Sequence, residues 1–159
     1  MRPEHLSSLE SLQLFLCGFE DGSLPKAEWT HSAHVAAAAY YLHEANQGAT
    51  YDTAYDIVLP QIRHRIQAYN LAVGGANTAT SGYHETLTRF WLRVVAALLR
   101  ARQPGSSLEA SRLAVADLGE QRSLHTLYYS GDVVKDSVAR IGWREPDLKP
   151  LPELANSLG

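Results

Sequence analysis

The chain has 159 residues, of which 45% are hydrophobic and 19% are charged. This length fits one domain spanning residues 1–159, and the composition excludes disorder driven by charge and low hydrophobicity. Fourteen Lys and Arg residues against 17 Asp and Glu residues give a formal net charge of −3, which argues against nucleic acid and anionic membranes as partners.

Hydrophobic residues at spacings of three and four predict four long helices in the first two thirds of the chain. The second follows Thr30, a residue type that caps helix starts, and continues through an alanine-rich stretch. The third is expected to continue through Pro60. Short connections between successive long helices favour antiparallel neighbours, so we expect these four to form a bundle. Their expected ranges are residues 6–19, 31–48, 51–73 and 83–102.

Shorter elements are expected after the bundle. Ser106, followed three residues later by Glu109, predicts a capping box that opens a fifth helix ending near Gly119. Two further short helices are expected around residues 124–129 and 133–141. Residues 143–159 contain three prolines and predict an extended tail, held to the bundle by Trp143, Leu148 and Leu151. The predicted class is all-α.

Three of the seven histidines are predicted to point into the bundle at the same end. His31 and His34 fall in the first turn of the second helix, about 60° apart on its apolar face. His84 falls in the first turn of the fourth helix, close to the centre of its apolar stripe. Because antiparallel neighbours alternate in direction, the second and fourth helices start at the same end, where we expect a pocket.

Three neutral imidazoles in one pocket favour a divalent transition metal, with zinc and iron as the first candidates. Cys17 is the only cysteine, so a site of several thiolates is excluded. An open metal position would bind water or substrate, and Glu85 is the candidate general base, with Glu28 as the alternative. The leading hypothesis is therefore a metal-dependent enzyme acting on a small molecule.

The walls of the pocket are expected to come from the residues around these histidines. The glycine-rich loop over residues 74–82 is long enough to form a lid over the pocket. Candidate substrate contacts are Trp29, Asn70, Thr78, Thr80 and Tyr83.

Other interpretations remain open. Inward histidines at helix starts often form hydrogen-bond networks without a metal, so the pocket can instead hold an organic ligand, or the bundle can serve in partner binding. His43 and His64 are expected at the surface, whereas His5 and His125 stay unassigned. A homodimer is possible. The sequence lacks an apolar signal segment and any stretch of about 18 apolar residues, so we expect a cytoplasmic protein.

Two motifs carry a resemblance to a known family. Residues 29–34 read W-T-H-S-A-H and residues 82–86 read G-Y-H-E-T. Together with the proline-rich end of the chain, they resemble an uncharacterised family of small bacterial helical proteins. The resemblance implies that His31, His34 and His84 belong to one site, and it implies no activity, substrate or metal.

Overall fold

The computed structural model describes residues 1–48 and 50–151, and every regular element within them is helical. The predicted all-α class is therefore confirmed. The α-helices are α1 (Leu9–Asp21), α2 (His31–Ala45), α3 (Tyr51–Ala72), α4 (Glu85–Arg102), α5 (Ser107–Leu118), α6 (Gly131–Lys135) and α7 (Ser137–Ile141). Short 3-10 helices occupy Pro3–Leu6, Lys26–Glu28 and Leu124–Leu127.

Side chains cap the helix starts where the sequence predicts them. The Thr30 hydroxyl accepts a hydrogen bond from the Ala33 amide at 3.3 Å, and the Ser106 hydroxyl accepts one from the Glu109 amide at 3.1 Å. Each bond satisfies one of the backbone N–H groups that a helix start leaves free. The Glu109 carboxylate accepts from the Gly105 amide at 2.7 Å, one residue before the position that a capping box predicts.

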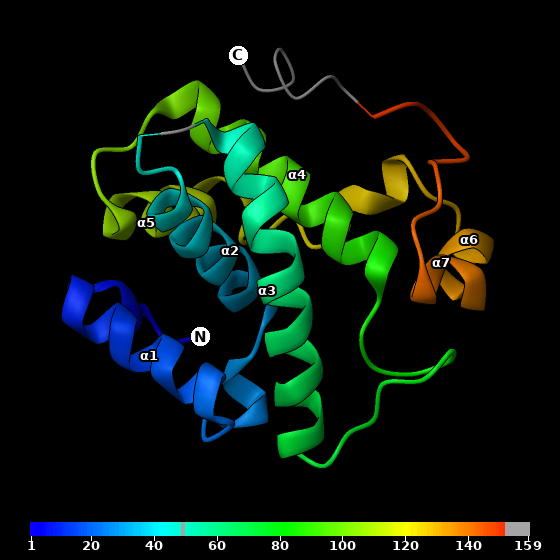
Figure 1. The fold of residues 1–159 in the computed structure, drawn as a ribbon, viewed down its shortest axis with the longest axis horizontal. Coiled ribbons are helices and arrows are strands. Elements are labelled where there is room, and N and C mark those ends of the chain that lie inside the picture. Colours follow the sequence, from blue (N-terminus) through cyan, green and yellow to red (C-terminus); the bar gives the residue numbers. More distant parts are fainter. Residues whose placement is uncertain (49, 152–159) are drawn as a thin grey trace.

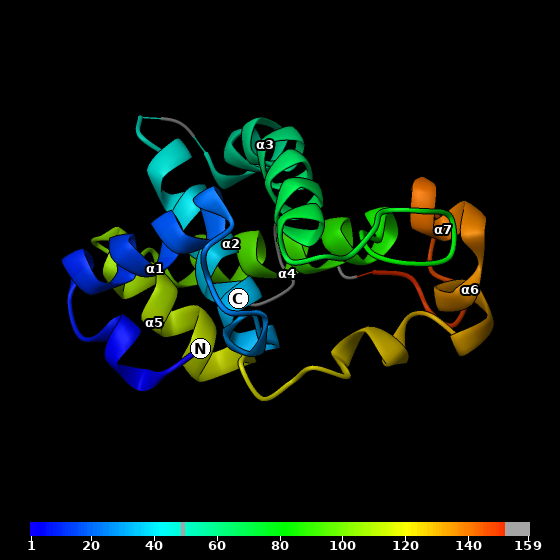
Figure 2. The ribbon, with the colours of Figure 1, turned by 90° about the horizontal axis from the view of Figure 1, so that it is seen from below.

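The expected bundle of the first four helices is not confirmed, because the main partner of α2 is α5 (Figures 1 and 2). Small residues cover the facing surfaces, including the buried Ala36, Ala110 and Ala114, and they let the two backbones approach closely. The Ser111 hydroxyl donates to the Ala36 carbonyl at 2.8 Å within this contact. The other faces of α2 pack against α3 and α4.

The close contact between α2 and α5 leads to a prediction for the variant Ala114→Leu. Ala114 is fully buried, so three added carbon atoms must push the helices apart and lower the free energy of unfolding by about 1–3 kcal/mol. The matched control Ala116→Leu changes an exposed residue of the same helix and should alter stability by less than about 0.5 kcal/mol. Urea unfolding measures both, and equal stability of the two variants contradicts this packing.

A second, smaller core lies where the first half of α4 meets α6 and α7, at one end of the molecule in Figure 2. It is built on Phe90, Tyr129 and Val133, and Trp143 and Leu151 pack against it. Residues 143–151 contain no helix.

Leu148, which the sequence predicts to hold the tail to the bundle, does not pack into this smaller core. Its side chain is 54% exposed, although its amide donates to the Tyr128 carbonyl at 2.9 Å. The rest of the expected tail, residues 152–159, lies outside the described residues.

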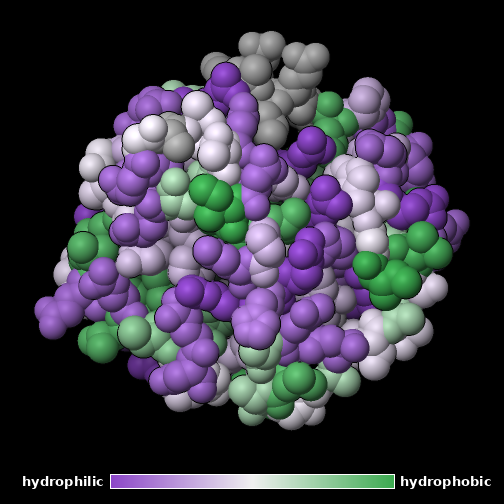
Figure 3. Space-filling model, viewed as in Figure 1, coloured by the Kyte–Doolittle hydropathy of each residue, from purple (hydrophilic) through white to green (hydrophobic). Residues whose placement is uncertain are grey.

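None of the helices in the described part of the chain is both long and apolar enough to cross a membrane. Large apolar side chains that remain exposed come from several elements, among them Leu14 on α1, Leu71 on α3 and Ile141 on α7. Figure 3 shows apolar residues in separate small groups on the face drawn, with polar residues between them.

Candidate ligand-binding cavity

A cavity of about 540 Å³ lies between α2, α3 and α4, and the loop that joins α3 to α4 forms part of its wall. The structure brings His31, His34 and His84 to this one cavity, as the sequence suggests. Trp29, Asn70 and Tyr83 of the expected substrate contacts also line it.

Thr78 and Thr80 do not line the cavity. Both are exposed in the loop, where the Thr80 amide donates to the Thr78 hydroxyl at 3.2 Å. They stabilise a turn of the loop and are separate from the cavity wall.

His31 and His34 occupy the start of α2 in different surroundings. The Nε2 of His31 lies 3.0 Å from the Leu118 carbonyl at the end of α5, and its ring meets Trp91 edge-on at 4.5 Å between centroids. The ring of His34 lies 4.2 Å from that of Trp29. Burial lowers the pKa of both imidazoles, and it lowers that of His34 to about 4, so both are neutral near pH 7.

His84 is the N-cap of α4, one position before the helical turn in which the sequence places it. Its Nδ1 accepts a hydrogen bond from the Leu87 amide at 3.2 Å, so this nitrogen carries no proton. The proton is therefore on Nε2, which donates to the Val134 carbonyl of α6 at 2.8 Å. Both ring nitrogens of His84 are thus engaged by the protein itself.

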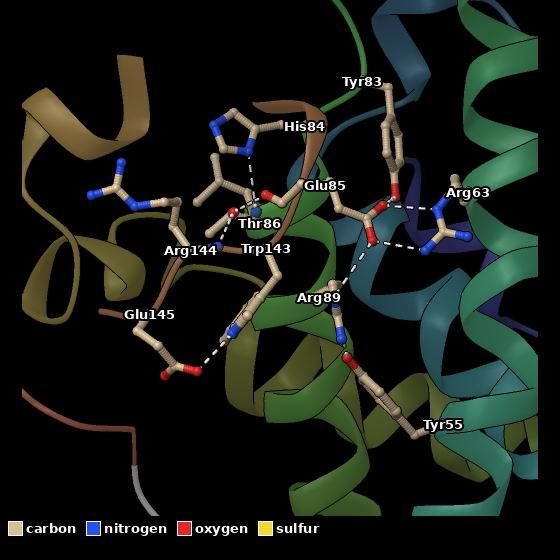
Figure 4. A network of polar contacts seen from close by, with 12 residues as sticks. Tyr55, Arg63, Tyr83, His84, Glu85, Thr86, Arg89, Trp143, Arg144 and Glu145 are labelled. Atoms are coloured by element: carbon tan, nitrogen blue, oxygen red, sulfur yellow. Dashed lines mark hydrogen bonds and ion pairs between the residues drawn. The ribbon is translucent and has the colours of Figure 1, made fainter. Parts of the chain in front are cut away.

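Glu85 is 6% exposed, and its carboxylate points away from His84, toward α3 (Figure 4). Arg63 donates to its two oxygens at 2.8 and 2.7 Å, and the Tyr83 hydroxyl donates to one of them at 2.7 Å. Burial opposes the charge on Glu85, but the bonds from Arg63 and Tyr83 outweigh it and lower the pKa of the carboxyl. Glu85 does not line the cavity, so the structure does not bring it to the place where the expected base is needed.

The alternative base, Glu28, is also engaged elsewhere. Its carboxylate lies 2.8 Å from the Nε2 of His5 and 3.2 Å from the Nε of Arg2. The hydrogen bond with His5 lowers the pKa of Glu28. This residue joins the N-terminal segment to the start of α2 and does not line the cavity.

Metal binding by the three histidines stays a prediction. Within residues 1–48 and 50–151, no three His, Cys, Asp or Glu side chains form a group that could hold a metal ion. His84 would have to exchange its bonds to the Leu87 amide and the Val134 carbonyl before it could ligate.

Sequence reasoning missed Thr86, which is 1% exposed. Its hydroxyl donates to the Gly142 carbonyl at 2.7 Å and accepts from the Arg144 amide at 3.0 Å (Figure 4). This residue ties α4 to the segment that follows α7. Its partners lie more than 55 residues along the chain, so no local pattern could have revealed this role.

Asn77 was also missed, and it fixes the loop at the cavity. Its side-chain oxygen accepts from the Asn70 amide group at 2.9 Å and the Tyr83 backbone amide at 3.2 Å, and its nitrogen donates to the Gln67 carbonyl at 2.9 Å. Gly82 closes the loop with a φ of 83°, where a Cβ atom would lie 1.8 Å from the Ala76 carbonyl oxygen. Only glycine fits this position.

His125, left unassigned by the sequence, lies close to the same end of the molecule. Its ring centroid is 6.4 Å from that of Trp91, and its Nδ1 is buried without a hydrogen-bond partner within the described residues. Burial lowers its pKa. His125 thus adds a second imidazole near Trp91, besides that of His31, although it does not line the cavity.

Comparisons of the chain with protein-family models, with curated proteins and with solved structures return no match. The resemblance based on the two histidine motifs therefore stays a prediction.

The position of Glu85 predicts the effect of the variant Glu85→Gln. The loss of its charge weakens the paired hydrogen bonds from Arg63, which should lower the free energy of unfolding at pH 7 by about 1–3 kcal/mol. A folded-state pKa below the unfolded one stabilises the protein above the unfolded value and loses this effect as the pH falls through the folded value. The variant should therefore lose less stability than wild type between pH 5 and pH 3.

Urea unfolding across this pH range measures the effect, with Glu120→Gln as a control at an exposed carboxylate. If Glu85→Gln and Glu120→Gln show the same stability and the same acid dependence, the Glu85 network does not stabilise the fold.

Burial of His31, His34, His84 and His125 predicts a second pH effect at less acidic pH. Each has a folded-state pKa below the unfolded value of about 6.5. The unfolded chain therefore binds more protons, and the free energy of unfolding should fall as the pH is lowered from about 6.5 toward 4.

The variant His34→Gln should reduce this slope, and His64→Gln controls for loss of an imidazole from an exposed position. Urea unfolding at half-unit pH intervals gives the slopes. A wild-type stability that is constant between pH 6.5 and 4.5 argues against neutral, buried histidines.

Proposed function

We propose that this protein binds a small organic molecule in the cavity between α2, α3 and α4. The observation that carries the proposal is the cavity itself. Its volume of about 540 Å³ falls within the range of about 300–1,000 Å³ typical of small-molecule sites. Apolar side chains from all three helices line it, including Val35, Ile62 and Leu92, together with polar side chains that come mainly from the ends of the helices and the loop.

Aromatic side chains give the cavity firm walls. Trp29 stacks on Phe19 at 4.1 Å with an interplanar angle of 14°, and it lies 5.6 Å from Tyr69. Trp91 makes edge-on contacts with His31 and Phe90, at 4.5 and 5.2 Å between centroids. Indole rings fixed in this way present flat apolar surfaces without further loss of side-chain freedom, which favours an aromatic or branched aliphatic ligand body.

Polar groups on the cavity wall can orient a bound ligand. His31 uses one ring nitrogen to donate to the Leu118 carbonyl, and the neutral imidazole of His34 can donate or accept through its ring nitrogens. The Asn70 side chain, held by Asn77, also lines the wall. A ligand with an apolar body and one polar end fits this division of the surface.

Filling the cavity tests the proposal. Ala38 lines it at 6% exposure, so Ala38→Phe should block binding, whereas Ala68→Phe on the exposed face of α3 should leave binding intact. Saturation-transfer NMR with a panel of neutral indole, phenyl and cyclohexyl compounds measures binding. We expect members of the panel to bind wild type and Ala68→Phe and to lose at least about tenfold in affinity for Ala38→Phe.

Two results would overturn the proposal. One is a panel in which no compound binds wild type. The other is binding that persists unchanged in a folded Ala38→Phe variant, because the compounds would then occupy some other place on the protein.

A further inference from the structure

We infer that the ligand is an organic monoanion, a carboxylate on an aromatic or branched aliphatic body, because the cavity wall formed by the described residues holds Lys26 and three imidazoles but no carboxylate. This inference rests on the proposed function and adds the charge of the ligand.

The acidic side chains nearest to the three histidines in sequence are already neutralised by other partners. Glu85 is paired with Arg63 and accepts from Tyr83, and Glu28 is paired with Arg2 and His5. Neither lines the cavity, so neither opposes an anion there.

Lys26 supplies a cation for the ligand. It lies in the short helix Lys26–Glu28 at the cavity, it is exposed, and it takes part in no ion pair within the described residues. A carboxylate in the cavity would therefore find a positive charge that no protein carboxylate occupies. A single lysine matches one negative charge better than two, which favours a monoanion.

The charges around the cavity also favour an anion. The arginine charges that lower the pKa of these imidazoles are that of Arg122 for His31 and that of Arg140 for His84. Neither is acidic. The starts of α2 and α4 also lie at the cavity, and the free N–H groups of helix starts add positive potential. The wall thus attracts an anion from several elements.

The half-buried His31 and His34 connect anion binding to proton uptake. Burial keeps His31 and His34 neutral near pH 7 by lowering the pKa of each. A carboxylate beside them raises both values, because an opposite charge favours the protonated ring. The other titratable groups at this wall are Lys26, Tyr83, whose hydroxyl donates to Glu85, and His84, which uses both ring nitrogens. Binding of the anion should therefore take up protons and tighten as the pH is lowered from 7.5 to 6.

Matched compounds test the inference on the full chain. Phenyl, indolyl and cyclohexyl bodies, each carrying a propionate, a propionamide or a propylamine chain, differ within a set only in the charge of the polar end. We expect at least one propionate to bind about tenfold or more tightly than its amide and the amines to bind weakest. Calorimetry in two buffers of different ionisation enthalpy should show proton uptake with the propionate and none with the amide.

A variant and its control complete the test. Lys26→Ala removes an exposed charge, and it should weaken the propionate about three- to tenfold and leave the amide unchanged. Lys149→Ala, at a lysine that does not line the cavity, should change neither.

The outcomes separate the two proposals. Amides that bind as tightly as the propionates, or propionates unaffected by Lys26→Ala and bound without proton uptake, overturn the anion inference and leave the cavity as a site for neutral ligands. If no compound of any charge binds, the proposed function fails together with it.

Discussion

The start of α4 holds this structure together through three consecutive buried side chains that bind three different elements. His84 bonds to the Val134 carbonyl of α6, Glu85 pairs with Arg63 of α3, and Thr86 bonds to the backbone on either side of Trp143 (Figure 4). Without these bonds, α6 and α7 would keep only their apolar contacts with α4. The wall of the cavity near Tyr83 and Leu87 depends on the same anchoring.

Residues that suggest chemistry in the sequence therefore serve largely as structural connections here. A neutral imidazole offers one donor and one acceptor on opposite sides of its ring, and His84 uses both to join two helices. The Glu85 carboxylate accepts several hydrogen bonds, so one side chain can satisfy Arg63 and Tyr83 together. His31 and His34 differ from His84, because they meet the cavity from α2 and their polar groups are less fully committed.

Much of the helical structure follows from local sequence, since hydrophobic spacing and capping residues act over three or four positions. Thr30 and Ser106 cap helices as expected, and the facing of His31 and His34 follows from helical phase. These three histidines lie at one cavity because α2 and α4 both start there.

The rest of the fold and of the cavity depends on contacts between distant parts of the chain. The preference of α2 for α5 arises from matched small residues, such as Ala36 and Ala114, that carry little signal in a hydrophobic pattern. In the sequence Glu85 is a candidate base. In the structure Arg63, 22 residues earlier, donates a hydrogen bond to its carboxylate. The start of α4 lies two residues later than the sequence suggests, and this shift makes His84 a cap.

The protonation state of His84 tests this account most directly. Long-range proton–nitrogen NMR at pH 7, with the His84→Asn variant identifying the signal, reports which ring nitrogen carries the proton. The account predicts an uncharged ring with the proton on Nε2 and an unprotonated Nδ1 that accepts a hydrogen bond. A ring protonated on Nδ1, or charged at pH 7, would contradict the claim that His84 joins α4 to α6.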